Sequence, residues 1–400
     1  MSNLIKYKFS DLYEMGSGIS TSKEQAGHGY PFASFSTVIN NYFLPDTLTD
    51  LMDTTEEQRE VSSILEGDIL ITRTSETPNE LAMSCVALKD YPNAAFSGFV
   101  KRLRPKNKDL VYPKYMAFYL RGPYFRKLVN SNTVMTLRAS FNEHIFKFMN
   151  IYLPPYETQK QIGDLLYKID QKIKINNEIN DNLQQLITTI YDYYFSQFNF
   201  PDANNKPYKD SNNKLEWCEK LKMMIPYNWE VKSIINYFNI YQPETISNKE
   251  FNDSSEFKVY GGGGLIGRYN KYNHEDSEVI ISCRGSCGNI YFTSPKSWIT
   301  GNAMVVHPLT TYLSKYFIFE FLKRFGVEKY LTGSVQKQLT RENLSLMNIC
   351  VPDNDTLTKY NNLVKPLFDK FIIIREENDN LINLRNELLP LLINGQVSID

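Results

Sequence analysis

Residues 149–190 read MNIYLPPYETQKQIGDLLYKIDQKIKINNEINDNLQQLITTI, and residues 347–388 read MNICVPDNDTLTKYNNLVKPLFDKFIIIREENDNLINLRNEL. The two segments align without a gap at an offset of 198 positions, and 14 of their 42 paired positions are identical. The identical groups include Met-Asn-Ile at the start of each copy and Asn-Asp-Asn-Leu near its end. The chain is therefore two copies of one plan, in which a variable block precedes a repeated segment.

Each repeated segment has the alternating three- and four-residue spacing of a coiled-coil helix. In the first copy, one row is Leu166, Ile173, Asn180, Ile187 and Tyr194, and the alternate row is Ile169, Asn176, Leu183 and Ile190. In the second copy, the corresponding rows are Val364, Phe371, Asn378, Arg385 and Leu392, and Leu367, Ile374, Leu381 and Leu388. A helix from about Glu157 to Ser196 would be roughly 60 Å long, and it needs a partner to bury its apolar stripe. The other copy is the expected partner.

A duplicated chain that folds on itself tends towards a pseudo-twofold axis, which makes the two helices antiparallel. Asn180 and Asn378 lie near the middle of both helices, so we expect them to face each other and fix the register. The alternative is that both asparagines lie at the edge of the seam and bind water. Pro366 replaces Lys168 of the first copy, and it predicts a kink or a delayed start in the second helix.

Composition indicates a globular chain of two or three domains, because 400 residues with 42% hydrophobic content can form real cores. There is no run of about 18 apolar residues and no pattern of a cleavable signal peptide, so we expect a cytoplasmic protein. The five cysteines and four histidines lack the spacing of a metal site, which favours buried thiols and no bound metal.

The two variable blocks share a pattern of strand, arginine and loop. Residues 68–73 (DILITR) and residues 278–284 (EVIISCR) each predict a short apolar strand followed by an arginine. Residues 112–130 and 312–331 have helical spacing, and each block ends with a polar loop before its Met-Asn-Ile strand. This duplication favours a shared binding role for the arginine loops over isolated surface ion pairs.

The residue types in these loops suit DNA. Arginine pairs with guanine, glutamine or asparagine pairs with adenine, and short hydroxyls reach either base. The glycines of residues 260–267 (YGGGGLIG) let the backbone approach a phosphate. The DNA-binding candidates are Arg73, Thr74, Ser75, Lys101, Arg102, Arg138, Ser140, Tyr260, Gly262, Gly263, Arg284, Ser286, Gln336, Lys337 and Gln338. The net charge of −1 predicts weak DNA binding by the chain alone.

Three motifs imitate an active site without its chemistry. Residues 153–156 (LPPY) resemble the Asn/Asp-Pro-Pro-Tyr/Phe motif of amino-methyltransferases, but leucine replaces the polar first residue. Asp202 with Glu230 and Lys232 fits only a loose nuclease pattern, and the four glycines are not followed by Gly-Lys-Ser/Thr. We therefore expect no catalytic residues, no cofactor and no metal on this chain.

The whole chain resembles the specificity subunit of a type I restriction-modification enzyme. Residues 191–198 (YDYYFSQF), 200–202, 206–208, Trp217 and 225–229 (IPYNW) resemble the central linker of that family. Residues 260–264, 284–288 and 298–302 resemble a common type of recognition domain, and residues 388–396 (LLPLLINGQ) resemble the C-terminal repeat. The first recognition domain departs most from the family, with an extended segment at residues 44–61.

The resemblance implies an α+β fold, in which two pseudo-symmetric mixed α/β target-recognition domains are separated by two long conserved helices forming an antiparallel coiled coil. The expected segments are recognition domain 1 (residues 1–155), the central helix (156–198), a linker (199–225), recognition domain 2 (226–353), and the C-terminal helix with its tail (354–400).

The resemblance also implies a DNA-binding subunit that performs no chemistry itself. It would recognise a bipartite site in double-stranded DNA and use its helices as a ruler for the spacer. Its implied partners are two methyltransferase subunits, which use S-adenosylmethionine to methylate adenine, and the family also allows two restriction endonuclease and translocase subunits that use ATP and Mg²⁺. The alternatives are a self-sufficient enzyme, and a coiled-coil scaffold that binds proteins without sequence-specific DNA binding.

Overall fold

The computed structural model describes residues 4–75, 80–132, 139–202, 204–211, 214–227, 229–333 and 336–397. The chain divides into two compact units: unit 1 comprises Met1–Ile175 and Glu377–Asp400, and unit 2 comprises Asn176–Glu376. These units cut across the segments expected from the sequence, because each long helix contributes to both. The functional boundaries expected above therefore stay a prediction.

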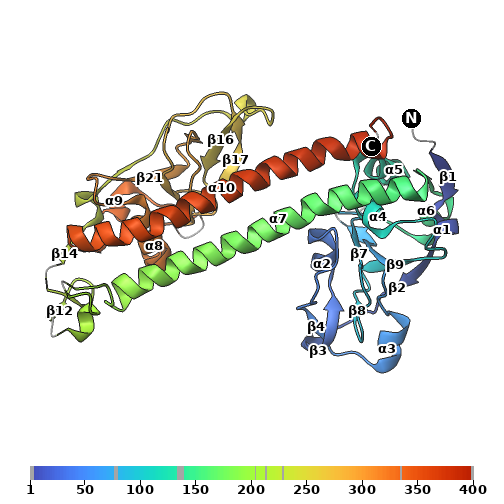
Figure 1. Ribbon diagram of the computed structural model, residues 1–400, viewed down its shortest axis with the longest axis horizontal. Coiled ribbons are helices and arrows are strands. Elements are labelled where there is room, and N and C mark those ends of the chain that lie inside the picture. Colours follow the sequence, from blue (N-terminus) through green and yellow to red (C-terminus); the bar gives the residue numbers. More distant parts are fainter. Residues whose placement is uncertain are drawn as a thin grey trace. The chain divides into compact units, whose positions relative to one another are not determined.

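The two repeated segments form the long helices α7 (Tyr156–Tyr191) and α10 (Asn354–Ile393), drawn in green and red in Figure 1. Their first residues are 198 positions apart, as the repeat predicts. A π-helical turn, Asp192–Ser196, follows α7. At the start of α10, Asp353 Oδ1 accepts a hydrogen bond from the Thr356 amide at 2.9 Å, which caps the helix. The expected delayed start at Pro366 was wrong, since α10 starts at the equivalent position and continues through the proline. Pro366 removes one backbone hydrogen bond and its ring crowds the carbonyl four residues earlier, so the kink stays a prediction.

The helices are antiparallel within each unit. In unit 1, Arg385 Nη1 lies 3.1 Å from Asp170 Oδ1, and Lys172 Nζ lies 3.3 Å from Glu377 Oε1. In unit 2, the ring of Tyr360 near the start of α10 lies 6.3 Å from the ring of Tyr191 at the end of α7. The expected antiparallel pairing is confirmed.

Unit 1 is built on small sheets and short helices. Its main sheet has the antiparallel order β2-β9-β5-β7, and a second sheet has the order β4-β3-β8 with β8 parallel to β3. Two further pairs are β1-β11 and β10-β6. The strands are β1 (Ile5–Lys8), β2 (Tyr13–Ser17), β3 (Ala26–Ala33), β4 (Leu51–Met52), β5 (Ile69–Thr72), β6 (Thr74–Ser75), β7 (Ser84–Val86), β8 (Ala95–Phe96), β9 (Val100–Pro105), β10 (Ala139–Ser140) and β11 (Asn150–Leu153). The short helices are α1 (Phe9–Leu12), α2 (Phe35–Asn40), α3 (Glu56–Val61), α4 (Pro113–Tyr119), α5 (Pro123–Asn132) and α6 (Glu143–Phe148).

Unit 2 repeats this topology. Its main sheet has the antiparallel order β15-β21-β18-β19, its second sheet has the order β17-β16-β20 with β20 parallel to β16, and β14 pairs with β22. A separate hairpin joins β12 and β13. The strands are β12 (Leu215–Cys218), β13 (Met223–Pro226), β14 (Glu230–Ser233), β15 (Phe238–Tyr241), β16 (Phe257–Gly261), β17 (Gly264–Tyr269), β18 (Val279–Ser282), β19 (Ile290–Phe292), β20 (Trp298–Ile299), β21 (Ala303–Pro308) and β22 (Asn348–Val351). The helices are α8 (Lys315–Phe325) and α9 (Arg341–Leu344). The duplication therefore extends through the variable blocks.

The two helices expected in the variable blocks are shorter than predicted. Residues 112–130 form α4 and α5 with a break at Gly122, because Pro123 opens a new helix. Within residues 312–331, α8 covers Lys315–Phe325, and Gly326 with a backbone φ of 64° caps its end.

Each unit has its own aromatic core. In unit 1, Phe9, Tyr115 and Phe141 pack with Leu392 and other apolar residues near the end of α10. In unit 2, Phe195, Trp229 and Phe317 pack with Tyr360 and Phe368 from the start of α10. Both cores therefore depend on the long helices. All five cysteines are free thiols, of which Cys85 and Cys283 are buried.

Candidate nucleic-acid interface

The strands β5 and β18 occupy the same inner position in their main sheets, and all four residues of each are buried. Each strand ends on a hydroxyl residue with no exposed surface, Thr72 in unit 1 and Ser282 in unit 2. The predicted arginines follow: Arg73 is the next residue after β5, and Arg284 is the second after β18, and both are exposed. In both units the segment that carries the arginine therefore follows the end of the equivalent inner strand, and we call this segment the arginine loop.

In unit 1 the backbone of Arg73, the first residue after β5, makes hydrogen bonds through both its amide and its carbonyl. The Arg73 amide donates to the Phe99 carbonyl at 2.8 Å, and the Arg73 carbonyl accepts from the Phe141 amide at 2.8 Å. Thr74 pairs with Ser140 in the β6-β10 ladder. The structure thus brings Arg73, Thr74, Ser75 and Ser140 together, whereas Arg138 lies outside the described residues.

Lys101 on β9 lies beside this loop. It pairs with Ile71 of β5, and its Nζ donates to Ser17 Oγ at 2.6 Å. Burial lowers the pKa of Lys101, and the nearby positive charge of Arg73 lowers it further. The negative charge of Glu143 opposes this shift, so Lys101 lies near both a positive and a negative side chain at this end of the main sheet.

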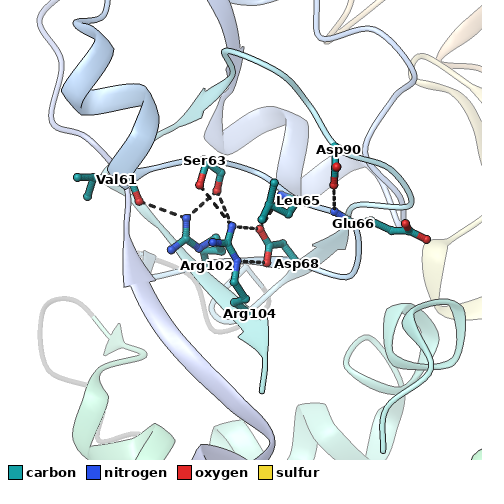
Figure 2. Close-up of polar contacts among 8 residues, drawn as sticks. All are labelled: Val61, Ser63, Leu65, Glu66, Asp68, Asp90, Arg102 and Arg104. Carbon is teal, nitrogen blue, oxygen red and sulfur yellow. Dashed lines mark hydrogen bonds and ion pairs between the residues drawn. The ribbon is translucent and has the colours of Figure 1, made fainter. Parts of the chain in front are cut away.

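The neighbouring residue Arg102 is directed elsewhere. Its Nη1 donates to the carbonyls of Ser63 at 2.6 Å and Val61 at 3.2 Å, as Figure 2 shows. Beside it, Arg104 binds Asp68 through two nitrogens, with Nε–Oδ1 at 2.8 Å and Nη2–Oδ2 at 2.7 Å. These contacts occupy Arg102 and Arg104 within unit 1. Of the two predicted DNA-binding residues Lys101 and Arg102, only Lys101 therefore lies near the arginine loop.

In unit 2, Arg284 stands between two surface hollows. One hollow of about 470 Å³ is lined by Gly262, Gly263, Ser286 and Asn302, among others. The other, of about 490 Å³, is lined on its polar side by Gln242, Gln338, Arg341 and Glu342. Arg284 borders both hollows. The structure therefore places Gly262, Gly263, Arg284, Ser286 and Gln338 around these two hollows, and their role in binding stays a prediction.

The turn at Gly262 touches the arginine loop closely. A Cβ atom at Gly262 would lie only 2.7 Å from the Arg284 carbonyl oxygen, so a side chain there would push the two segments apart. The Gly262 carbonyl accepts hydrogen bonds from Ser282 Oγ at 2.6 Å and from Ser286 Oγ at 2.5 Å. Glycine is thus required here for close approach of two backbones.

Three candidates of unit 2 lie outside these hollows. Tyr260 is only 4% exposed, and its hydroxyl lies 3.1 Å from Ser294 Oγ in the interior. Gln336 and Lys337 are exposed in the loop that ends at Gln338, whose backbone pairs with Thr332 through two hydrogen bonds of 2.9 Å. Among the described residues of this loop, Gln338 alone reaches the Arg284 hollow.

The hollows also contain polar residues that were not among the candidates: Gln242, Asn248, Asn302, Arg341 and Glu342. Gln242 follows β15, which runs parallel to β18 because both are antiparallel to β21. The two strands therefore end at the same edge of the sheet. Arg341 follows the polar loop that precedes the Met-Asn-Ile strand, so its position in the sequence was the available signal.

The asparagines proposed to fix the helix register belong to different units. Asn378 in unit 1 is 6% exposed, and its Nδ2 lies 3.4 Å from the Ile173 carbonyl. Asn180 lies on the part of α7 that belongs to unit 2, and its Oδ1 is buried. Their mutual contact stays a prediction.

The motifs that imitate catalysis have local structural roles. Leu153 is buried at the end of β11, and the Pro154 carbonyl accepts a hydrogen bond from Gln159 at the start of α7. Asp202 Oδ1 accepts from the amides of Asn204 and Lys206 within its own turn. Across the described ranges, no group of three or more His, Cys, Asp or Glu side chains could hold a metal ion, and no helix is long and apolar enough to cross a membrane.

Comparison with known proteins agrees with this architecture over nearly the whole chain. The chain is 22% identical to the type I restriction enzyme HindI specificity subunit of Haemophilus influenzae, covering 99% of this chain and 100% of that protein. It is 21% identical to the type I restriction enzyme MjaIX specificity subunit of Methanocaldococcus jannaschii, covering 98% and 93%. The crystal structure of the S subunit of a type I restriction-modification system from M. genitalium has the same fold, with a TM-score of 0.64, 15% identity, and coverage of 98% and 96%.

One protein family matches both halves of the chain. Its sequence profile, described as the type I restriction modification DNA specificity domain, matches residues 1–185 and 226–383. These two ranges contain both arginine loops and most of both long helices. The chain therefore belongs to the family of type I restriction-modification DNA specificity subunits.

Proposed function

We propose that the arginine loops of the two units each recognise one half of a bipartite site in double-stranded DNA. The chain is a DNA specificity subunit of a type I restriction-modification complex, and such a subunit recognises DNA while other subunits catalyse the reaction. One observation supports the proposal that each arginine loop recognises one half-site. Arg73 and Arg284 follow equivalent inner strands in two units of the same topology. Two equivalent surfaces on one chain suit two half-sites.

The chemistry of the surface around Arg284 supports direct recognition of bases. A guanidinium group can donate two hydrogen bonds to guanine, and the carboxamides of Gln242 and Gln338 can pair with adenine. The carboxylate of Glu342 can accept from the amino group of cytosine. In unit 1, Arg73 and the hydroxyls of Thr74 and Ser140 offer a smaller set of donors and acceptors, so we expect the two half-sites to differ in sequence.

The chain acts within a type I restriction-modification complex. We propose two methyltransferase subunits as its partners, with S-adenosylmethionine bound to them, and we expect ATP and Mg²⁺ to bind to restriction subunits where these are present. Helices α7 and α10 each contribute residues to both units, and we propose that they set the spacer between the half-sites.

The test is to combine the chain with its methyltransferase subunit and map methylated adenines across a genome-sized DNA at single-base resolution. A split motif with a fixed gap is the expected result. A stable complex that methylates no defined motif would contradict the proposal and favour a scaffold that only binds proteins.

A further inference from the structure

We propose that the buried hydroxyls of Ser282 and Thr72 are positioning groups, which orient the two arginine loops and thereby set the selectivity for each half-site. This inference rests on the proposed function, because it assigns a role to residues that do not themselves touch DNA. Neither side chain has any exposed surface, so neither can reach a base. Each acts through the loop that follows it.

Ser282 joins the arginine loop to the neighbouring glycine turn. Its Oγ lies 2.6 Å from the Gly262 carbonyl oxygen and 3.1 Å from the Arg284 carbonyl oxygen, so one hydroxyl is shared between two acceptors. Its backbone closes the loop at the base, since the Ser282 amide donates to Asn289 at 2.8 Å and its carbonyl accepts from Gly288 at 2.9 Å. The hydroxyl therefore connects the two segments that border the hollow beside Arg284.

The Gly262 carbonyl is a common anchor for both sides of the loop. Ser282, two residues before Arg284 in the sequence, donates a hydrogen bond to it, and so does Ser286, two residues after Arg284. The exposed guanidinium thus projects from a segment that is fixed at two points. Because base recognition depends on the direction of the guanidinium donors, a small rotation of this segment would weaken discrimination more than it would weaken folding.

Thr72 has the equivalent role in unit 1 with different partners. It occupies the same place in the repeated pattern of the inner strand, and its Oγ1 donates to the Glu80 carbonyl at 2.5 Å and accepts from the Met83 amide at 2.9 Å. These bonds attach the end of β5 to the segment that leads into β7. In both units, therefore, a buried hydroxyl lies at the end of the equivalent strand, just before a loop of unrelated sequence.

Two other buried serines show that burial alone does not create this role. Ser297 in unit 2 and Ser84 in unit 1 are also fully buried, and within the described residues their Oγ atoms have no hydrogen-bond partner. Replacing them by alanine removes a buried hydroxyl without removing a bond. They are matched controls for Ser282→Ala and Thr72→Ala.

The test compares these variants in complex with the methyltransferase subunits. The measurement is the ratio of affinities for the cognate site and for sites with one substituted half-site, at a fixed salt concentration. We expect Ser282→Ala to reduce this ratio by about tenfold at one half-site, which matches the loss of one or two hydrogen bonds. Thr72→Ala should do the same at the other half-site. Thr72→Ser, Ser297→Ala and Ser84→Ala should keep the wild-type ratios.

The half-site affected by Ser282→Ala must also be the one affected by Arg284→Ala. An unchanged ratio in a folded Ser282→Ala variant would overturn the inference, and so would an equal loss at both half-sites or a loss shared by the control variants. If the wild-type complex itself does not distinguish the cognate site from sites with one substituted half-site, the proposed function fails. That result is distinct from a selective wild type whose Ser282→Ala variant is equally selective.

Discussion

Asp68 and Arg104 form a two-point ion pair at the start of the inner strand of unit 1, at the end opposite to the arginine loop. Asp68 has no exposed surface. In unit 2 the equivalent pair is Glu278 and His307, with Nδ1 and Oε1 2.9 Å apart. Burial raises the pKa of Glu278, and the His307 partner opposes that shift. Both units thus combine a buried carboxylate at one end of the strand with an exposed arginine at the other.

Replacing Arg104 by alanine should destabilise unit 1 by about 2–4 kcal/mol, because it leaves the Asp68 carboxylate buried without its cation. Thermal unfolding and amide hydrogen exchange of β5 and β9 would measure the loss. The control is Lys147→Ala, which removes an exposed pair with Glu143 and should cost less than about 0.5 kcal/mol. Equal losses in both variants would show that the buried pair has no special role.

Replacing Arg284 by alanine should relax recognition of one half-site by about 1–3 kcal/mol for each lost base contact, while the other half-site is unaffected. Arg73→Ala should give the reciprocal result. Competition binding with a panel of substituted sites is the measurement. If Arg284→Ala instead weakened binding to all sequences equally and lowered the salt dependence, the arginine would contact phosphate.

Glu320 on α8 predicts a pH dependence of stability in unit 2. It is 2% exposed and accepts hydrogen bonds from Gln184 and Thr188 of α7, both at 2.9 Å, and burial raises its pKa above the ordinary 4.5. The folded state therefore binds this proton more tightly than the unfolded state. The associated stability is fully present below the unfolded pKa and is lost as pH rises through the raised value.

The free energy of unfolding of the wild type, relative to Glu320→Gln, should therefore increase on acidification from pH 7 towards 4.5. Denaturant unfolding at several pH values would measure this difference. Glu342 offers a contrast, because a backbone hydrogen bond and the Thr340 hydroxyl lower its pKa. Relative to Glu342→Gln, the wild type should therefore lose stability as the pH falls below 4.5. A wild type that loses stability on acidification relative to Glu320→Gln would contradict the assignment.

Inserting seven residues into both long helices should change the preferred spacer or prevent assembly. The insertions belong after Ile175 in α7 and after Glu376 in α10, where the units divide. Each adds about 10 Å of helix and preserves the heptad pattern. The methylated motif, mapped as above, is the measurement, with a single-helix insertion as the control for lost pairing. A spacer that stays unchanged in an assembled double-insertion variant would refute the role of the helices as a ruler.

The sequence predicted those parts of the fold that depend on local periodicity. The heptads gave the long helices, whose starts differ by the repeat offset, and the apolar runs before Arg73 and Arg284 gave the inner strands. The locations of neighbouring side chains on a strand were harder to predict, because successive side chains point to opposite faces of the sheet. This alternation separates Lys101 from Arg102. Tyr260 lies inside β16 and is in the core, although Gly262 and Gly263 two and three residues later line a surface hollow.

Residues brought together by long-range pairing could not be predicted from spacing. Gln242 reaches the surface of Arg284 only because β15 and β18 flank β21 in the same direction. Likewise, the Ser282 hydroxyl binds a carbonyl 20 residues earlier, and no sequence pattern marks that contact. Such positions depend on the order of strands in the sheet.

The core of unit 1 includes Leu389, Leu392 and Ile393, which are among the last helical residues of the chain. During synthesis unit 1 therefore cannot complete its interior until residues 389–393 have left the ribosome. Unit 2, whose residues are contiguous, has all of its core available earlier. The order of folding should run against the order of translation, and a premature stop shortly after Glu376 would damage the end of the protein that was made first.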